Sequence, residues 1–259
     1  MTAFQQTHIT LVLDRSGSMD ACRQQTVDAL NTYLKEARGD QHLKEADFGI
    51  LQFDTQVITE MRVGAPINVK DLTLDDFVPR GGTPLYDAIG RGVDRLDAAL
   101  KKSGSTKAIL VILTDGQENA SRKHTHESIS GLIKERQDKG WLLVFLGAGL
   151  DVARVGVGLG ISTANVASYG FDAASMQSVA RSLSSSTQGY AATADSAGAK
   201  SWMAAGGGAF TPEQRANMNA GQNYDLNQPA APPAASPVAF QGSTGGDTWQ
   251  SGNKDAWNQ

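Results

Sequence analysis

Cysteine is nearly absent from this sequence of 259 residues, which contains only Cys22. A single cysteine cannot form an intramolecular disulfide, so the chain lacks the covalent framework on which many small secreted domains depend. The N-terminal stretch MTAFQQTHITLVL also lacks the basic flank, the apolar segment and the small-residue cleavage site of a signal peptide. We therefore expect a cytoplasmic protein.

Long apolar runs and an excess of positive charge are absent as well. The longest apolar run, WLLVFLGAGL, is only about ten residues long, which is too short to cross a bilayer as a helix. The formal net charge of -4 provides no basic surface for a phosphate backbone. These absences predict a protein that binds neither membranes nor nucleic acids.

Apolar, strand-like runs alternate along the chain with segments of helical periodicity. Strands are predicted at residues 8–13, 47–53, 107–113 and 141–147. The run at 56–61 follows its predecessor after Asp54 and Thr55 only, which predicts a hairpin and one antiparallel edge strand. The pattern as a whole predicts an α/β fold: a three-layer αβα sandwich, Rossmann-like, around a doubly wound and mostly parallel sheet.

Helices are predicted where apolar residues recur every three or four positions, as in residues 27–37, 85–100 and 176–183. Beyond residue 187 the composition shifts to Ala, Gly, Ser, Gln, Asn and Pro without a sustained apolar period. We therefore predict a folded domain over residues 1–187 and a mostly disordered, low-complexity tail over 188–259. Within that tail, TPEQRANMNAG has a capping box and predicts a short helix at 212–220.

Three loops next to the ends of predicted strands or the start of a helix carry oxygen donors: DRSGS, GGTP and TDG. Ligands of a doubly wound sheet bind outside the carboxyl ends of its parallel strands, so we expect these loops to meet there. Carboxylates and hydroxyls are the ligands that Mg²⁺ or Mn²⁺ prefers. The sequence therefore predicts one metal site, and its candidate ligands are Asp14, Ser16, Ser18, Thr83 and Asp115.

With DRSGS, GGTP and LTDG in this order, residues 7–186 resemble the von Willebrand factor type A domain and its metal-ion-dependent adhesion site. The resemblance implies that the two serines and Thr83 bind the cation through hydroxyls. It implies that Asp14 and Asp115 hold the cation directly or through water. Met19 and the run TPLYDAI are more similar to the bacterial and phage-encoded intracellular branch of the family than to the secreted animal branch.

Two carboxylates and three neutral hydroxyls offset the charge of a divalent ion and leave it electrophilic enough for one more anionic oxygen. The resemblance implies that an exposed Asp or Glu of a partner protein supplies this oxygen. The start of a long helix, expected immediately after Ser18, would favour an incoming anion through its dipole. We expect a metal-dependent protein-binding domain, monomeric on its own, without catalytic residues.

Alternatives remain open at this point. A turn and a helix cap are a second explanation of the DRSGS residues, and Asp20 and Asp87 have a second explanation as acids that complement helix dipoles. The protein could be the recognition subunit of an AAA+ ATPase, which similar bacterial proteins accompany. A magnesium-dependent phosphohydrolase would use Arg15 and Arg80 as cations, but the sequence shows no paired general base, Walker-type loop or serine elbow.

Overall fold

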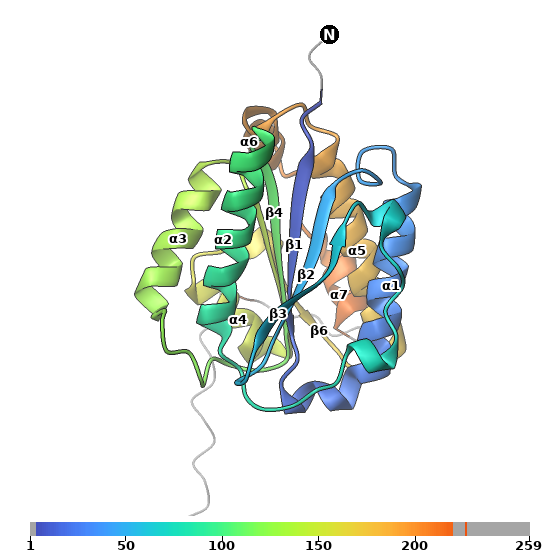
Figure 1. Ribbon diagram of the computed structural model, residues 1–259, viewed down its shortest axis with the longest axis vertical. Coiled ribbons are helices and arrows are strands. Elements are labelled where there is room, and N and C mark those ends of the chain that lie inside the picture. The colour runs from blue at the N-terminus through green and yellow to red at the C-terminus, as the bar shows by residue number, and fades with distance from the viewer. Residues whose placement is uncertain (1–3, 220–225, 227–259) are drawn as a thin grey trace, which may run out of the picture. The chain divides into compact units, whose positions relative to one another are not determined.

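Six strands form one sheet in the computed structural model, which describes residues 4–219 and 226 (Figure 1). The strands are β1 (Thr7–Asp14), β2 (Asp47–Phe53), β3 (Ile58–Gly64), β4 (Lys107–Thr114), β5 (Leu142–Ala148) and β6 (Val166–Tyr169). Their order is β3-β2-β1-β4-β5-β6, and only β3, at one edge, runs antiparallel to its neighbour. The predicted hairpin and the mostly parallel sheet are confirmed.

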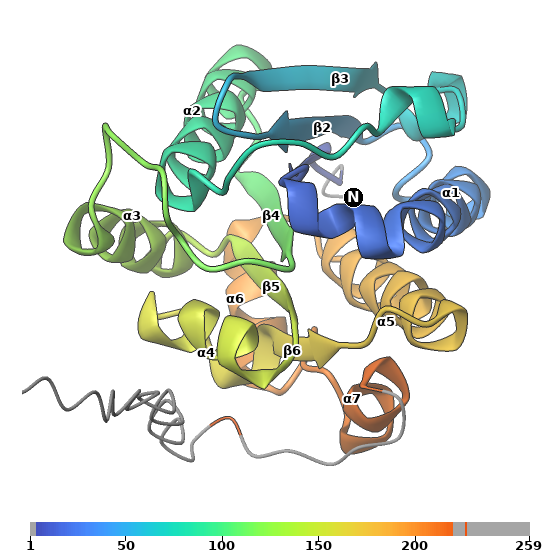
Figure 2. The ribbon, with the colours of Figure 1, turned by 90° about the horizontal axis from the view of Figure 1, so that it is seen from below.

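Helices cover both faces of this sheet (Figure 2). One face packs against α1 (Arg23–Gly39), α5 (Ala173–Ala191), α6 (Ser196–Ala204) and α7 (Pro212–Met218). The opposite face packs against α2 (Leu85–Ser103), α3 (His126–Asp138) and α4 (Leu150–Gly158). The predicted three-layer αβα sandwich is therefore confirmed. In the described part of the chain, the helices are too short or too polar to cross a membrane.

Alternate strand residues build the two hydrophobic clusters that hold the layers together. On β1, Leu11 and Leu13 enter the cluster on the α1 side, whereas Val12 enters the cluster on the α2 side. This alternation follows from the two-residue period of a strand. It also fixes which polar residues of β1 face α2, since His8 and Thr10 share the face of Val12.

The strand order reverses direction at β1 and β4, which lie side by side in parallel register with Leu13 opposite Leu113. The chain leaves β1 toward β2 on one side of the sheet and leaves β4 toward β5 on the other side. Loops that diverge in this way open a crevice at the carboxyl ends of the strands. Asp14 ends β1 and Asp115 directly follows β4, so both acids lie at this crevice.

Two local features differ from the sequence prediction. The long helix does not start immediately after Ser18, because a 3₁₀ helix (Gly17–Cys22) precedes α1. The range of the α4 helix was not predicted; its nine residues start at Leu150, directly after Gly149, which has a φ of 78°. A left-handed glycine there allows the chain to turn sharply from β5 into the helix.

The predicted domain boundary at residue 187 lies inside α5, and two further helices follow it. Phe210 and Met218 are buried in the cluster on the α1 side. Thr211 and Gln214 form the capping box that starts α7, where the sequence predicts a helix at 212–220. The predicted disorder of residues 220–259 falls, Leu226 apart, outside the described residues.

Candidate metal centre

Asp14 lies at the carboxyl end of β1 and is fully buried. Its Oδ1 accepts the backbone N–H of Ser16 at 2.7 Å, an Asx turn that leads the chain out of the strand. Its Oδ2 accepts the hydroxyl of Thr114, the last residue of β4, at 2.5 Å. Burial raises the pKa of Asp14 to about 6 against the effect of these hydrogen bonds, and the charge of Asp115 adds to the rise.

Two of the predicted hydroxyl ligands meet at the carboxylate of Asp115. Ser18 Oγ donates to Asp115 Oδ1 at 2.8 Å, Ser16 Oγ lies 3.4 Å from the same oxygen, and the two hydroxyl oxygens are 3.1 Å apart. The other carboxylate oxygen, Asp115 Oδ2, is buried and has no hydrogen-bond partner among the described residues. Burial raises the pKa of Asp115, although the two serine hydroxyls act to lower it.

Thr83 is held beside Asp14 by the loop that follows β4. Its N–H donates to Asn119 Oδ1 at 2.9 Å, and its carbonyl accepts the N–H of Asn119 at 3.1 Å. A Cβ atom on Gly116 would lie 3.0 Å from Thr83 Oγ1 and 3.8 Å from Asp14 Oδ2. The glycine therefore leaves open the space between these two side chains, and the structure brings all five predicted residues together in one crevice.

Backbone hydrogen bonds join the first two loops directly. The N–H of Gly17 donates to the carbonyl of Gly81 at 3.0 Å, and the N–H of Arg80 donates to the carbonyl of Arg15 at 2.8 Å. Gly81 has a φ of 68°, a left-handed conformation that is strained for other residues. Gly81 is thus required by the turn that brings Thr83 to the crevice.

Asp54 is a residue that sequence reasoning missed. It is buried at the end of β2, where its Oδ2 accepts Arg15 Nη2 at 2.6 Å and Arg80 Nε at 2.9 Å. Burial acts to raise the pKa of Asp54, but hydrogen bonds from Arg80, the backbone and Arg15 outweigh it and keep the pKa below its usual value. Both arginines that flank the crevice are therefore ion-paired with one carboxylate.

Two further acids organise the loop after Asp115. Asp87, in the first turn of α2, accepts the backbone N–H groups of residues 122–124 at 2.8–2.9 Å. Glu118 accepts the backbone N–H of Tyr86 at 2.9 Å. Asp87 is thus a loop anchor as well as a first-turn acid. No local sequence pattern marks these pairs, because their members are more than 30 residues apart.

The donor set of the crevice fits a hard divalent cation. Two carboxylates with raised pKa values lie close together, one of their oxygens is buried without a partner, and three hydroxyl side chains surround them. Across the described residues, no group of three or more His, Cys, Asp or Glu side chains is arranged to hold a metal. A cation in this crevice would consequently depend on hydroxyl and carboxylate oxygens together.

Comparison with known families agrees with this architecture. Residues 9–117 match the family described as the von Willebrand factor type A domain, and this segment contains all five residues of the crevice. The chain has the fold of a von Willebrand factor type A domain. No curated protein matches the sequence.

Two solved structures have a fold similar to that of this chain. Proximal thread matrix protein 1 from the mussel byssus is 15% identical, with a TM-score of 0.53, over 71% of this chain and 48% of that chain. The open form of the pilus adhesin SpaC from Lactobacillus rhamnosus GG is 14% identical, with a TM-score of 0.54, over 70% of this chain and 30% of that chain. The chain thus spans about half of the mussel protein and less than a third of the adhesin, and the likeness is one of fold.

Proposed function

We propose that this von Willebrand factor type A domain binds a partner protein through a divalent cation, Mg²⁺ or Mn²⁺, in the manner of a metal-ion-dependent adhesion site. The observation that carries the proposal is the buried Asp115 Oδ2, which has no hydrogen-bond partner among the described residues although Asp14 lies close by. Two buried carboxylates destabilise each other when both are ionised, unless a cation compensates them.

In this proposal, the five residues have two different roles in binding the cation. Asp14 and Asp115 supply negative charge, and the neutral hydroxyls of Ser16, Ser18 and Thr83 supply further oxygens without cancelling the charge of the ion. When bound, the cation provides an electrophilic centre that accepts an anionic oxygen from outside the domain. An exposed Asp or Glu of the partner is the side chain that matches this requirement.

The exposure of the crevice supports binding from one side. Asp14, Ser16 and Thr83 are buried, whereas Ser18 is exposed and Asp115 is half-buried. The loops are held by the Asx turn at Asp14 and by the backbone bonds between the loops, so the donors are positioned before a ligand arrives. A partner can therefore approach over Ser18 and Asp115 without opening the domain.

A purely structural role for DRSGS agrees less well with the geometry. Ser16 precedes the 3₁₀ helix, but its side chain makes no capping hydrogen bond to that helix. The hydroxyls of Ser16 and Ser18 are directed to Asp115 instead. These contacts favour a ligand site over a helix cap.

A phosphohydrolase is also disfavoured by the contacts in the crevice. That reaction needs a cation for the phosphoryl group, and the two candidates, Arg15 and Arg80, are both paired with Asp54. We therefore propose a binding function for this site and not a catalytic one.

We further propose that the protein acts in the cytoplasm, as part of the bacterial and phage-encoded intracellular branch. Cys22 is a buried free thiol, and TPLYDAI is similar to that branch. Nothing among the described residues favours an AAA+ ATPase over another protein with an exposed carboxylate as the partner.

The proposal is tested by capturing partners from the source cell with the full chain as bait, in Mg²⁺ and in EDTA, with identification by mass spectrometry. Wild type is compared with Asp14→Ala and with Asp20→Asn, a control at an exposed acid on the neighbouring 3₁₀ helix. We expect that wild type and the Asp20→Asn control capture the same partner in Mg²⁺ and lose it in EDTA. Asp14→Ala should not capture this partner in either buffer. Capture that persists in Asp14→Ala would contradict a metal bridge.

A further inference from the structure

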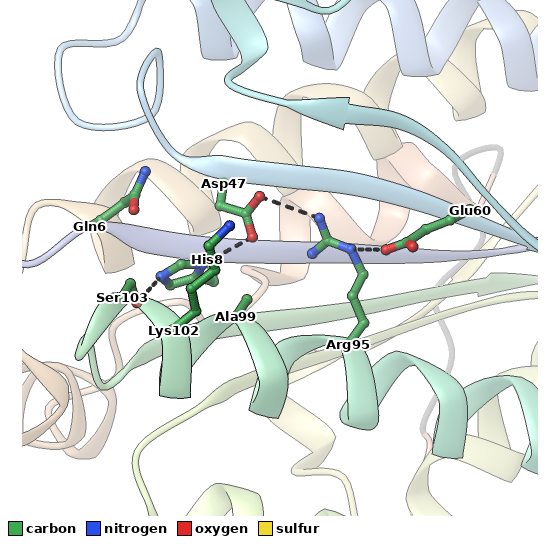
Figure 3. A pocket seen from close by; sticks show the side chains of 8 residues that line it. All are labelled: Gln6, His8, Asp47, Glu60, Arg95, Ala99, Lys102 and Ser103. Atoms are coloured by element: carbon green, nitrogen blue, oxygen red, sulfur yellow. Dashed lines mark hydrogen bonds and ion pairs between the residues drawn. The ribbon is translucent and has the colours of Figure 1, made fainter.

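A second cluster of polar side chains lies at the opposite end of β1, around a cavity of ≈ 450 Å³ (Figure 3). His8 near the start of β1 lies opposite Asp47 at the start of β2, and Ser103 ends α2 above them. Since a strand rises about 3.3 Å per residue, His8 and Asp14 are about 20 Å apart. The cluster is therefore separate from the candidate metal centre.

Hydrogen bonds connect these three side chains in series (Figure 3). His8 Nδ1 lies 3.0 Å from Asp47 Oδ2, and His8 Nε2 lies 2.8 Å from Ser103 Oγ. Burial acts to raise the pKa of Asp47, but the hydrogen bond from His8 and the charge of Arg95 outweigh it and lower the pKa. An ionised carboxylate only accepts hydrogen bonds, so His8 Nδ1 donates to Asp47. In the neutral form of the ring, Nε2 is then the acceptor for the Ser103 hydroxyl.

This is the order of contacts in a serine nucleophile, a histidine base and an orienting carboxylate. The histidine is 2% exposed and lies on the central sheet, whereas Ser103 is exposed at the rim of the cavity. A reactant therefore has access to the hydroxyl, whereas the base is almost fully buried. The N–H of Ser105 donates to Ser103 Oγ at 3.2 Å. The hydroxyl has two acceptors within reach, and His8 Nε2 at 2.8 Å is nearer than the carbonyl of Leu100 at 3.4 Å.

The carboxylate is held from a second side by Arg95 of α2. Its guanidinium lies 3.4 Å from Asp47 Oδ1 and donates to Glu60 Oε1 at 2.5 Å. A Cβ atom on Gly49 would lie 2.5 Å from Arg95 Nη2, so the glycine provides the room in which the guanidinium reaches β2 and β3. Asp47 is thus fixed by His8 and Arg95 on rigid elements, as an orienting residue must be.

Lys102 also lines the cavity and is not part of any ion pair among the residues that the structure describes. Arg95, in contrast, is balanced by Asp47 and Glu60. An ammonium group that lines the cavity is the type of donor that stabilises negative charge developing on a carbonyl oxygen. Two carboxylates, Asp47 and Glu60, and two cations, Arg95 and Lys102, line the cavity, so with neutral His8 it has no net charge and suits a small uncharged acyl compound.

We propose that Ser103, His8 and Asp47 form a metal-independent site that hydrolyses small carboxylic esters. Ser103 Oγ attacks the ester carbonyl carbon as its proton passes to His8 Nε2, and Asp47 stabilises the imidazolium. Lys102 stabilises the oxyanion. When the intermediate collapses, the bond to the alkoxide breaks, His8 protonates the alkoxide, and an alcohol leaves acyl-Ser103. Water, deprotonated by His8, then attacks the acyl carbon, and the return of the proton to Ser103 Oγ releases the carboxylic acid.

The test measures hydrolysis of p-nitrophenyl acetate by the full chain in EDTA, so that the metal centre plays no part. The matched variants are Ser103→Ala and Ser201→Ala, the latter at an exposed serine of α6 that donates to the carbonyl of Ala197. We expect kcat/KM to fall at least about 100-fold in Ser103→Ala, because general base assistance is lost with the nucleophile. Ser201→Ala should hydrolyse the ester at the wild-type rate.

A fluorophosphonate probe followed by peptide mass spectrometry identifies the acylated residue independently of turnover. In wild type we expect the label on Ser103 and not on Ser201, and in His8→Gln we expect the label on Ser103 to be lost while circular dichroism shows an intact fold. Equal labelling of both serines, retained labelling in folded His8→Gln, or wild-type hydrolysis by Ser103→Ala would each overturn the proposal.

Discussion

Ser18 Oγ donates a hydrogen bond to Asp115 Oδ1 at 2.8 Å, although the two residues are 97 positions apart in the sequence. The contact exists because β1 and β4 are neighbours at the point where the strand order reverses, so that their following loops share one crevice. It couples an exposed hydroxyl to an acid whose other oxygen is buried without a partner in the described part of the chain.

Removal of single oxygens should weaken cation binding in a graded way. We expect Asp14→Ala to abolish Mn²⁺ binding and Ser18→Ala to weaken it about tenfold, since a neutral hydroxyl contributes less than a carboxylate. Isothermal titration calorimetry with Mn²⁺ alone measures both effects, with Asp20→Asn as the control of unchanged affinity. Wild-type affinity in Asp14→Ala would exclude this crevice as the cation site.

Asp115→Asn should change stability in opposite directions with and without the cation. In EDTA the variant should unfold at a higher temperature than wild type, because the amide keeps an oxygen for Ser18 and removes a buried charge near Asp14. In Mg²⁺ at 100 times its dissociation constant, wild type should gain about 2.7 kcal/mol and the variant should gain little. Thermal unfolding in the two buffers measures this reversal in the order of the two unfolding temperatures. An equal increase of the unfolding temperature by Mg²⁺ in both proteins would contradict the prediction.

Lys107 predicts a stability change at alkaline pH. Its side chain is fully buried and its Nζ donates to the carbonyls of Ala191 and Thr193 at 2.6 Å, while burial lowers its pKa from 10.5 to about 8. Between these values the unfolded chain binds more protons than the folded chain, so the free energy of unfolding should rise with pH. Urea unfolding near the two ends of this range should show the rise in wild type and not in Lys107→Met. An equal pH dependence in both proteins would show that Lys107 does not titrate in this range.

The helices that follow residue 187 should be needed for stability. Deletion of residues 188–259 removes the buried side chains of Tyr190, Phe210 and Met218, each of which contributes about 1.5–3 kcal/mol on burial. We expect that protein to lose at least about 5 kcal/mol or to fail to fold. Deletion of residues 230–259 keeps every side chain that the structure describes in the two hydrophobic clusters and should leave the urea midpoint unchanged. Equal midpoints for the two deletions would contradict a structural role for α6 and α7.

The sheet and the five residues of the crevice were predictable from the sequence because both rest on local patterns. Apolar runs mark the strands, and Asp14, Ser16 and Ser18 alternate directly after one of them. The supporting contacts were not predictable, because Asp54 holds Arg80 and Asn119 holds Thr83 across long separations in the sequence. The same holds for Ser103 and His8, which only the packing of α2 on β1 brings together.

The end of α5 and the α6 helix, both beyond residue 187, escaped prediction for a different reason. Their composition is rich in Ala, Gly and Ser, which is also typical of disordered tails. The small residues serve packing here: a Cβ atom on Gly189 would lie 2.5 Å from the Trp202 ring, and one on Gly207 would lie 2.2 Å from it. Composition alone does not distinguish a segment that lacks a core from one whose glycines make room for a tryptophan.

The two backbone hydrogen bonds between Gly17 and Gly81 and between Arg80 and Arg15 tie the mobility of one loop to that of the other. Ser16 is the residue before Gly17, which is bonded to Gly81, and Thr83 lies two residues after Gly81 at the start of α2. The loops that carry the serines and the threonine are thus joined by these two bonds. Under the proposed function, a force exerted by a bound partner would be shared between β1 and α2 and would not fall on a single loop.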